Sequence, residues 1–140
     1  MASLARDTRS NAPAPVWIGR VLSGLFIAFM VMDAGMKIAG IQAVADTAGP
    51  LGWTQDLGFW RLIGLLALAL TALYAWPHTA VLGAVLLTGY LGGAIATHVR
   101  VGSPLLTHVL FGVYLALFMW GGLWLRSPAL RALLPFKTKE

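Results

Sequence analysis

The stretch "GYLGGAIATHVRVGSPLLTH", residues 89–108, decides how the second half of this chain folds. Two apolar segments meet here at a short polar turn, and a Thr-His pair lies on each side of it. Ser103 can cap the helix that follows the turn, and Pro104 suits the first position of that helix. The stretch therefore predicts a tight helical hairpin that carries two histidines and an arginine at its tip.

The composition of the chain indicates an integral membrane protein. Of its 140 residues, 59% are hydrophobic and only 11% are charged, with a mean hydropathy of +0.79. A soluble domain needs far more charge to cover its surface. The chain has no cysteine, which excludes disulfides, thiolate nucleophiles and iron–sulfur clusters. The net charge of +5 is concentrated toward the two ends, so we expect the lipid bilayer as a partner and no nucleic acid.

Four apolar segments predict the fold. Each is close to the roughly 20 residues that a helix needs to cross a bilayer core, and a helix satisfies its own backbone hydrogen bonds there. Short turns join the second segment to the third and the third to the fourth, so these neighbours are antiparallel. We predict an all-α transmembrane four-helix up-down bundle over residues 16–126, with spans at about 16–38, 59–76, 79–99 and 104–125.

The segments outside the spans carry three further predictions. Residues 1–15 are expected to form a mobile N-terminal tail, and residues 127–140 a basic C-terminal tail. The connection between the first two spans, residues 39–58, is the only long one and contains Gly49-Pro50 and Trp53. It predicts a short amphipathic or re-entrant piece at the membrane interface.

The distribution of Lys and Arg predicts the topology. Four spans place both termini on one side of the membrane, and that side carries Arg6, Arg9, Arg20, Arg126, Arg131, Lys137 and Lys139. The opposite side carries Lys37, Arg61 and Arg100. The excess of positive charge predicts that both termini are cytoplasmic.

Polar residues gather at the outer end of this bundle, to which every span contributes. The first three spans bring Asp33, Lys37, Arg61, Tyr90, Thr97, His98 and Arg100, and the fourth brings Thr107, His108 and Tyr114. Polar groups in a span are costly, so each invites an explanation. They can line a ligand pocket or only hydrogen-bond between helices. The spacing of the histidines does not support a metal site.

Two local patterns leave alternatives open. Asp33 and Lys37 are four residues apart and can form an ion pair that anchors the helix end; alternatively, Asp33 turns inward as the counter-ion of Arg61, Arg100 or a histidine. Gly89 and Gly93 form a GxxxG motif, and Gly121-Gly122 lies on the fourth span. Such small residues favour close packing within the bundle over dimerisation, although a homo-oligomer is not excluded.

Several motifs resemble the DoxX-like family of small bacterial membrane proteins. They are DAGMK (33–37), PHTAVLGA (77–84), LLTGYLGGA (86–94), ATHVRVG (96–102), WGGLWLR (120–126) and LRALLP (130–135). The resemblance covers about residues 16–135. It implies a four-helix protein, which we expect as a multi-pass protein of the bacterial cytoplasmic (inner) membrane. The wider family is linked to quinone-coupled sulfur oxidation and to membrane oxidoreductase complexes in oxidative-stress defence.

One departure from the family bears on chemistry. Relatives often carry an acidic residue in the second span, where this chain has Leu66-Ala67-Leu68. Proton or redox chemistry that depended on that carboxylate is therefore not expected here. Asp33 is the only acidic residue well inside a span.

We accordingly expect a lipophilic small molecule, with a quinone as one candidate, to bind at the polar outer end of the bundle. The ten polar residues gathered there are the candidate ligand-binding set, and Asp33, His98 and His108 are the candidate catalytic residues. The chain has no recognisable cofactor motif, so a soluble or membrane redox partner would carry the electron-transfer cofactor. The alternatives are a stand-alone membrane isomerase or hydrolase acting on a lipophilic substrate, and a non-catalytic scaffold or permease.

Overall fold

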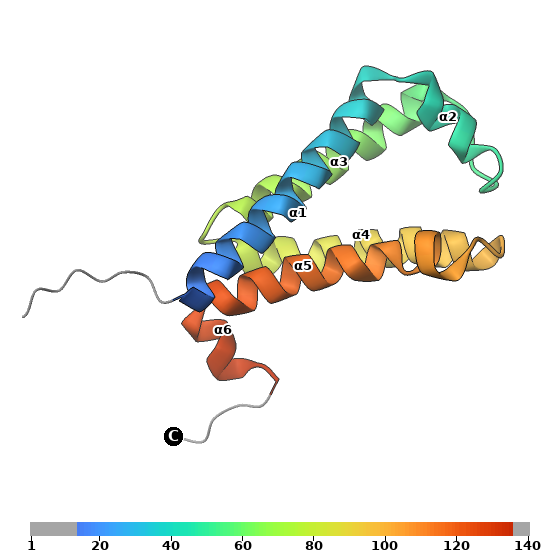
Figure 1. Ribbon diagram of the computed structural model, residues 1–140. Helices are drawn as coiled ribbons and strands as arrows, with labels where there is room; N and C mark the ends of the chain where they lie inside the picture. Colours follow the sequence, from blue (N-terminus) through green and yellow to red (C-terminus); the bar gives the residue numbers. More distant parts are fainter. Residues whose placement is uncertain (1–13, 136–140) are drawn as a thin grey trace, which may run out of the picture.

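The computed structural model describes residues 14–135, all of whose regular elements are helical (Figure 1). In chain order these are α1 (Ala14–Ala39), α2 (Gln42–Ala48), α3 (Leu57–Ala75), α4 (Ala80–Arg100), the π-helical turn η1 (Leu105–Val109), α5 (Phe111–Arg126) and α6 (Pro128–Leu133). The predicted mobile tail lies outside the described residues except for its last two, which belong to α1. The predicted C-terminal tail begins with α6, and residues 136–140 lie outside the described part.

Four helical stretches are long and apolar enough to cross a membrane: Pro15–Ala39, Leu57–Ala75, Ala80–Arg100 and Leu105–Arg126. The all-α, four-span fold predicted from the sequence is therefore confirmed. Helix α1 packs against α3 and α5, α3 packs against α4, and α4 packs against α5, which closes a ring of four. Large apolar side chains, such as Leu62 and Leu117, each 66% exposed, cover its outside, as a lipid-facing surface requires.

The fourth span begins differently from the prediction. Its first turn is π-helical, with the amide of Leu110 donating to the carbonyl of Leu105 at 2.9 Å. Pro104 occupies the capping position, and Ser103 does not cap the helix. Instead, the hydroxyl of Ser103 lies 3.0 Å from Nδ1 of His98. The predicted capping role of Ser103 was wrong because the histidine at the end of the preceding helix takes its hydroxyl.

Only some of the glycines expected to pack closely do so: Gly122 does, whereas Gly89, Gly93 and Gly121 do not. A Cβ added at Gly89 or Gly93 would meet no atom within 4 Å, so the GxxxG motif does not bring helices together. By contrast, a Cβ on Gly122 of α5 would lie 2.8 Å from the backbone nitrogen of Ser23 on α1. On α4, Gly83 lies directly against the backbone of α3. The glycines that pack closely are those whose helix face meets a neighbour, which a spacing motif alone does not reveal.

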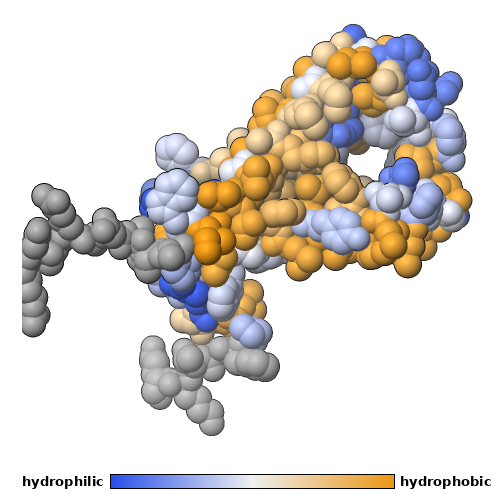
Figure 2. All heavy atoms as spheres, viewed as in Figure 1, coloured by the Kyte–Doolittle hydropathy of each residue, from blue (hydrophilic) through white to orange (hydrophobic). Residues whose placement is uncertain are grey.

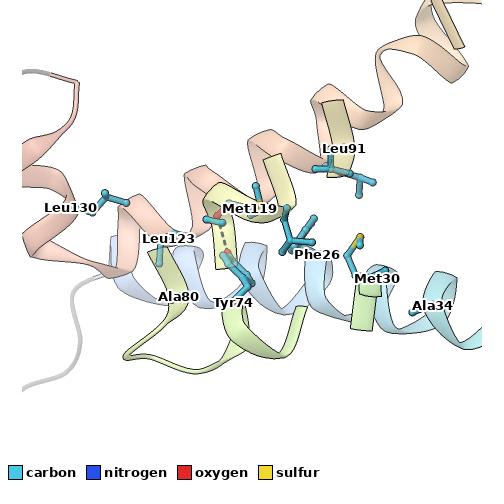
Figure 3. Close-up of a cluster of buried hydrophobic side chains, with 13 residues drawn as sticks. Phe26, Met30, Ala34, Tyr74, Ala80, Leu91, Met119, Leu123 and Leu130 are labelled. Atoms are coloured by element: carbon cyan, nitrogen blue, oxygen red, sulfur yellow. Dashed lines mark hydrogen bonds between the residues drawn. The ribbon is translucent and has the colours of Figure 1, made fainter. Parts of the chain in front are cut away.

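The end of the bundle that carries Ala14 and α6, here called the terminal end, is held by a buried polar chain. The hydroxyl of Tyr74, which is fully buried, donates to the carbonyl of Met119 at 2.7 Å (Figure 3). Ser23 Oγ then donates to the Tyr74 oxygen at 2.9 Å, and Arg126 Nε donates to Ser23 Oγ at 3.1 Å. The Arg126 guanidinium also lies 5.4 Å from the centre of the Tyr74 ring. Three helices are thus joined through one tyrosine.

Replacing Tyr74 by phenylalanine should lower the thermal stability of the purified protein. The variant leaves the Ser23 hydroxyl and the Met119 carbonyl without their partner in an apolar interior, at a cost of about 1–3 kcal/mol. The measurement is the unfolding temperature in detergent. Tyr114→Phe is the control, because the Tyr114 hydroxyl donates to the Leu106 carbonyl at an exposed position. Equal unfolding temperatures for the two variants would contradict the role given to Tyr74.

The helices diverge toward the opposite end, here called the linker end, which carries α2 (Figure 1). Two arms leave the terminal end, one formed by α1 and α3 and the other by α4 and α5 (Figure 1). Phe29 of α1 and Phe111 of α5 meet edge to face between the arms, with ring centres 5.2 Å apart. Beyond this contact the arms separate, and the space between them holds the candidate site.

Candidate functional site

A cavity of about 610 Å³ lies between the two arms at the linker end. Its walls come from α1, α3 and α4, and α2 with its flanking residues closes it at the linker end. Figure 2 shows the hollow as an opening that passes between the arms. This volume is within the range of small-molecule sites, roughly 300–1,000 Å³.

Five of the ten predicted site residues line this cavity: Asp33, Lys37, Tyr90, Thr97 and His98. The remaining fourteen lining residues are apolar, except for Thr47. A largely apolar wall with a few polar groups is the usual character of a site for a lipophilic ligand.

Asp33 and Lys37 form an ion pair across one turn of α1, and both side chains are partly buried. Of the two arrangements that the sequence left open, the structure has the local pair, and no other charged residue among those described bridges to Asp33. The pair nevertheless faces the cavity. It therefore offers a ligand both an anionic and a cationic group without leaving an unpaired charge in the bundle.

Tyr90 and His98 bring polar groups that remain available. No residue in the described part of the chain hydrogen-bonds to the Tyr90 hydroxyl, and His98 uses only Nδ1, toward Ser103. Thr97 is more fully engaged, because its hydroxyl donates to the Gly93 carbonyl at 2.9 Å and accepts from Trp53 Nε1 at 3.3 Å. The Tyr90 hydroxyl and Nε2 of His98 are thus the cavity-lining groups best able to bind a polar ligand atom.

The other five predicted residues lie outside the cavity lining. His108 packs edge to face behind His98, with ring centres 5.6 Å apart, and its Nδ1 lies 2.8 Å from the Thr107 hydroxyl. The Tyr114 hydroxyl donates a hydrogen bond to the Leu106 carbonyl within its own arm. The two histidines predicted at the tip of the hairpin do meet, but only His98 reaches the cavity.

Arg61 and Arg100 lie at the two ends of a cover segment, defined as residues 41–51 and containing α2. Gly40 and Gly52 flank this segment and have positive φ angles of 68° and 74°. A Cβ added at Gly40 would lie 2.8 Å from Nη2 of Arg61, and one at Gly52 would lie 2.9 Å from Nη2 of Arg100. Glycine is needed at both turns because the backbone is left-handed and a guanidinium fills the space of the side chain.

Arg100 also donates to the carbonyl of Leu51 at 2.6 Å, which ties the cover segment to α4. On its inner face Ala45 and Ala48 are buried. The long linker was predicted to hold a short interfacial piece, but its role as a wall of the site was not predicted. The apolar and aromatic residues of the linker could have indicated this role, because a segment too short to fold alone buries such side chains only by packing on other helices.

An aromatic cluster lines the cavity and was also missed by the sequence analysis. Trp53 stacks on Phe59 with ring centres 5.9 Å apart, and Phe59 meets Trp60 edge to face at 5.4 Å. Asp56 caps α3 by accepting from the amide of Phe59 at 2.8 Å, which orients the start of the helix. Tryptophan near the end of a span usually lies at the membrane interface, so the contribution of these rings to a cavity was not evident from the sequence.

Small residues form the facing wall on α4. Gly89 and Gly93 lie one turn apart along the cavity, and Ala94 follows them. Because a Cβ at either glycine would meet nothing within 4 Å, their lack of a side chain leaves space in the cavity. Among the described residues no cluster of three or more metal-binding side chains occurs.

The comparisons with known proteins agree with this architecture. The family model described as the DoxX-like family matches residues 21–122, from the first span into the fourth and through the whole cavity lining. No curated protein and no solved structure gives a match. Four membrane-crossing helices and a family match over most of the chain describe a multi-pass membrane protein, and the chain belongs to the DoxX-like family.

Proposed function

We propose that this protein binds a lipophilic small molecule with a compact polar head in the cavity at the linker end. The observation that carries this proposal is the cavity itself, about 610 Å³ of mostly apolar space with Asp33, Lys37, Tyr90 and His98 in its wall. A bundle that needed these polar residues only for stability would pair them with neighbouring helices, as it does with Tyr74 at the terminal end.

A quinone ring suits the available groups. Its carbonyl oxygens accept hydrogen bonds, which the Tyr90 hydroxyl and Nε2 of His98 can donate. The Lys37–Asp33 pair supplies a further donor and an acceptor for a reduced ring. Trp53, Phe59 and Trp60 offer aromatic faces and edges for contact with a flat ring.

We further propose that the protein acts as a subunit of a membrane oxidoreductase system, whose partner carries the electron-transfer cofactor. Nε2 of His98 can donate a hydrogen bond to, or accept one from, a bound head group. Binding is favoured over independent acid–base turnover because the cavity's one carboxylate, Asp33, is paired with Lys37. The positive charge at the terminal end supports cytoplasmic termini in a bacterial inner membrane, with the cavity toward the outer face.

Replacing His98 by alanine should weaken binding of decylubiquinone by about tenfold, since a hydrogen bond to a buried polar group contributes on the order of 1–3 kcal/mol. The measurement is equilibrium binding of the radiolabelled quinone to the purified protein in nanodiscs. His108→Ala is the control, because His108 touches His98 but lies outside the cavity lining.

The same assay separates a ligand role from a structural one. If His98→Ala keeps the affinity of the wild type but unfolds at a lower temperature, the histidine serves the hairpin and the proposal fails. Mass spectrometry of small molecules that co-purify from native membranes then tests the ligand class. A stoichiometric lipophilic compound that is absent from His98→Ala preparations supports the site.

A further inference from the structure

We propose that the ligand enters this cavity sideways, from the lipid leaflet at the linker end, through a side opening between the α1–α3 arm and the α4–α5 arm. The cover segment stays closed to water during entry. The ligand is an amphiphile of one leaflet, whose head occupies the cavity and whose tail extends through the side opening into lipid. The identity of that ligand rests on the proposed function, but the route does not.

The cover segment is fixed at several points. Within the segment, Arg100 of α4 hydrogen-bonds to the Leu51 carbonyl at 2.6 Å. At its two borders, Trp53 hydrogen-bonds to Thr97 of α4, and Arg61 of α3 lies against Gly40. The segment is therefore attached to both arms. Opening it would expose Ala45 and Ala48 and separate the arginine from its carbonyl acceptor. Water-side entry would have to break these contacts together.

Within the described part of the chain, the sides of the cavity, between the two arms, have no comparable segment held across them by hydrogen bonds. The contact of Phe29 with Phe111 marks the point where α1 and α5 part. From Phe29 to the end of α1 at Ala39 the helix rises by about 15 Å. This is about half of a hydrocarbon core of roughly 30 Å, the depth of one leaflet. Figure 2 shows the gap between the arms as a continuous opening at this end of the molecule.

The lining of the cavity suits a membrane-resident amphiphile. Met36 on α1 is 37% exposed, and Gly93 and Ala94 on α4 are exposed while lining the cavity. An acyl or isoprenoid tail can cross such an apolar surface without losing hydration. The polar groups, by contrast, would hold a head group, as Tyr90 and His98 do in the proposed site. A fully water-soluble ligand would lose its hydration on such an apolar path, so this route does not suit it.

Cysteine labelling tests the route without any ligand, and the natural chain has no cysteine to interfere. Val44 and Asp46 lie two residues apart on α2; Val44 lines the cavity, whereas Asp46 is exposed outside it. Val44→Cys and Asp46→Cys are each reconstituted into nanodiscs. Each is treated with a lipid-soluble reagent, N-dodecylmaleimide, or with a charged, sulfonated maleimide.

We expect Val44→Cys to react with the lipid-soluble reagent and to react at least about tenfold more slowly than Asp46→Cys with the sulfonated one, as a barrier of 1.4 kcal/mol or more would give. Equal rates of the two variants with the sulfonated maleimide would overturn the side route, because water would then reach the cavity past the cover. Failure of Val44→Cys to react with either reagent would also overturn it.

The outcome for the route is distinguishable from the outcome for the proposed function. Decylubiquinone added before the lipid-soluble maleimide should slow labelling of Val44→Cys and leave Asp46→Cys unaffected. If the labelling pattern holds but no quinone protects Val44→Cys, the side opening stands and the quinone assignment fails. If quinone binds but the sulfonated reagent reaches Val44→Cys freely, the function stands and the route fails.

Discussion

Replacing Gly83 by alanine is expected to destabilise the bundle more than the same replacement at any other glycine of residues 14–135. The new Cβ would lie 2.3 Å from the backbone nitrogen of Tyr74, 2.6 Å from its Cα and 2.7 Å from the carbonyl carbon of Leu73. All three are main-chain atoms of α3, so no side-chain rotation relieves the clash. Helices α3 and α4 must move apart, and Tyr74 with its buried hydrogen bonds moves with them.

The expected loss is about 3 kcal/mol or more, at the upper end of the cost of overpacking. Unfolding temperature in detergent and recovery of monodisperse protein are the measurements. Gly89→Ala is the control on the same helix, because its Cβ would meet no atom within 4 Å; we expect its stability to stay within about 0.5 kcal/mol of the wild type. A Gly83→Ala protein that unfolds at the wild-type temperature would show that α3 and α4 are not in backbone contact.

Replacing Gly93 by phenylalanine is expected to abolish ligand binding while the bundle stays folded. Gly93 lines the cavity, and the space beside it is open, so the ring would occupy the volume proposed for the ligand. Only a small stability change is expected, since the added side chain displaces no packed neighbour. Equilibrium binding of decylubiquinone should fall by at least about a hundredfold, which corresponds to about 2.7 kcal/mol.

Gly92→Phe is the control for this variant. Gly92 is the adjacent residue, is exposed and does not line the cavity, and a Cβ there would also meet nothing within 4 Å. Its variant should bind as the wild type does. If Gly93→Phe retained full affinity, the ligand site would lie elsewhere in the protein; if both variants lost binding alike, the effect would come from the surface of α4.

Much of the fold was predictable from the sequence, because the properties that specify it are local. Apolar length alone predicts the four spans, whose limits in the structure differ by a few residues at most from those expected. The short turns at Pro77 and Ser103 predict the order of neighbouring helices. Which glycines permit close approach was not predictable, since Gly83 and Gly89 differ only in the face of α4 on which they lie.

The site was predictable only in part. The depth of each polar residue follows from its position in a span, so the sequence grouped Asp33 with His98 at one end. Depth does not determine which way a side chain points. Arg61 and Arg100 share that level, yet they lie at the two ends of the cover segment and not in the cavity wall. The contribution of Trp53 depends on how the long linker folds back over the arms, a tertiary event that no periodic pattern encodes.

The parting of the arms at Phe29 and Phe111 divides the molecule into two halves with different tolerance to sequence change. On the side of the terminal end, the polar groups of Ser23, Tyr74 and Arg126 join helices to one another. On the side of the linker end, the Tyr90 hydroxyl and Nε2 of His98 form no hydrogen bond with another described residue. Residues around the cavity can therefore vary, and ligand preference can diverge between descendants of one ancestor, without compensating substitutions in the half that keeps the helices assembled.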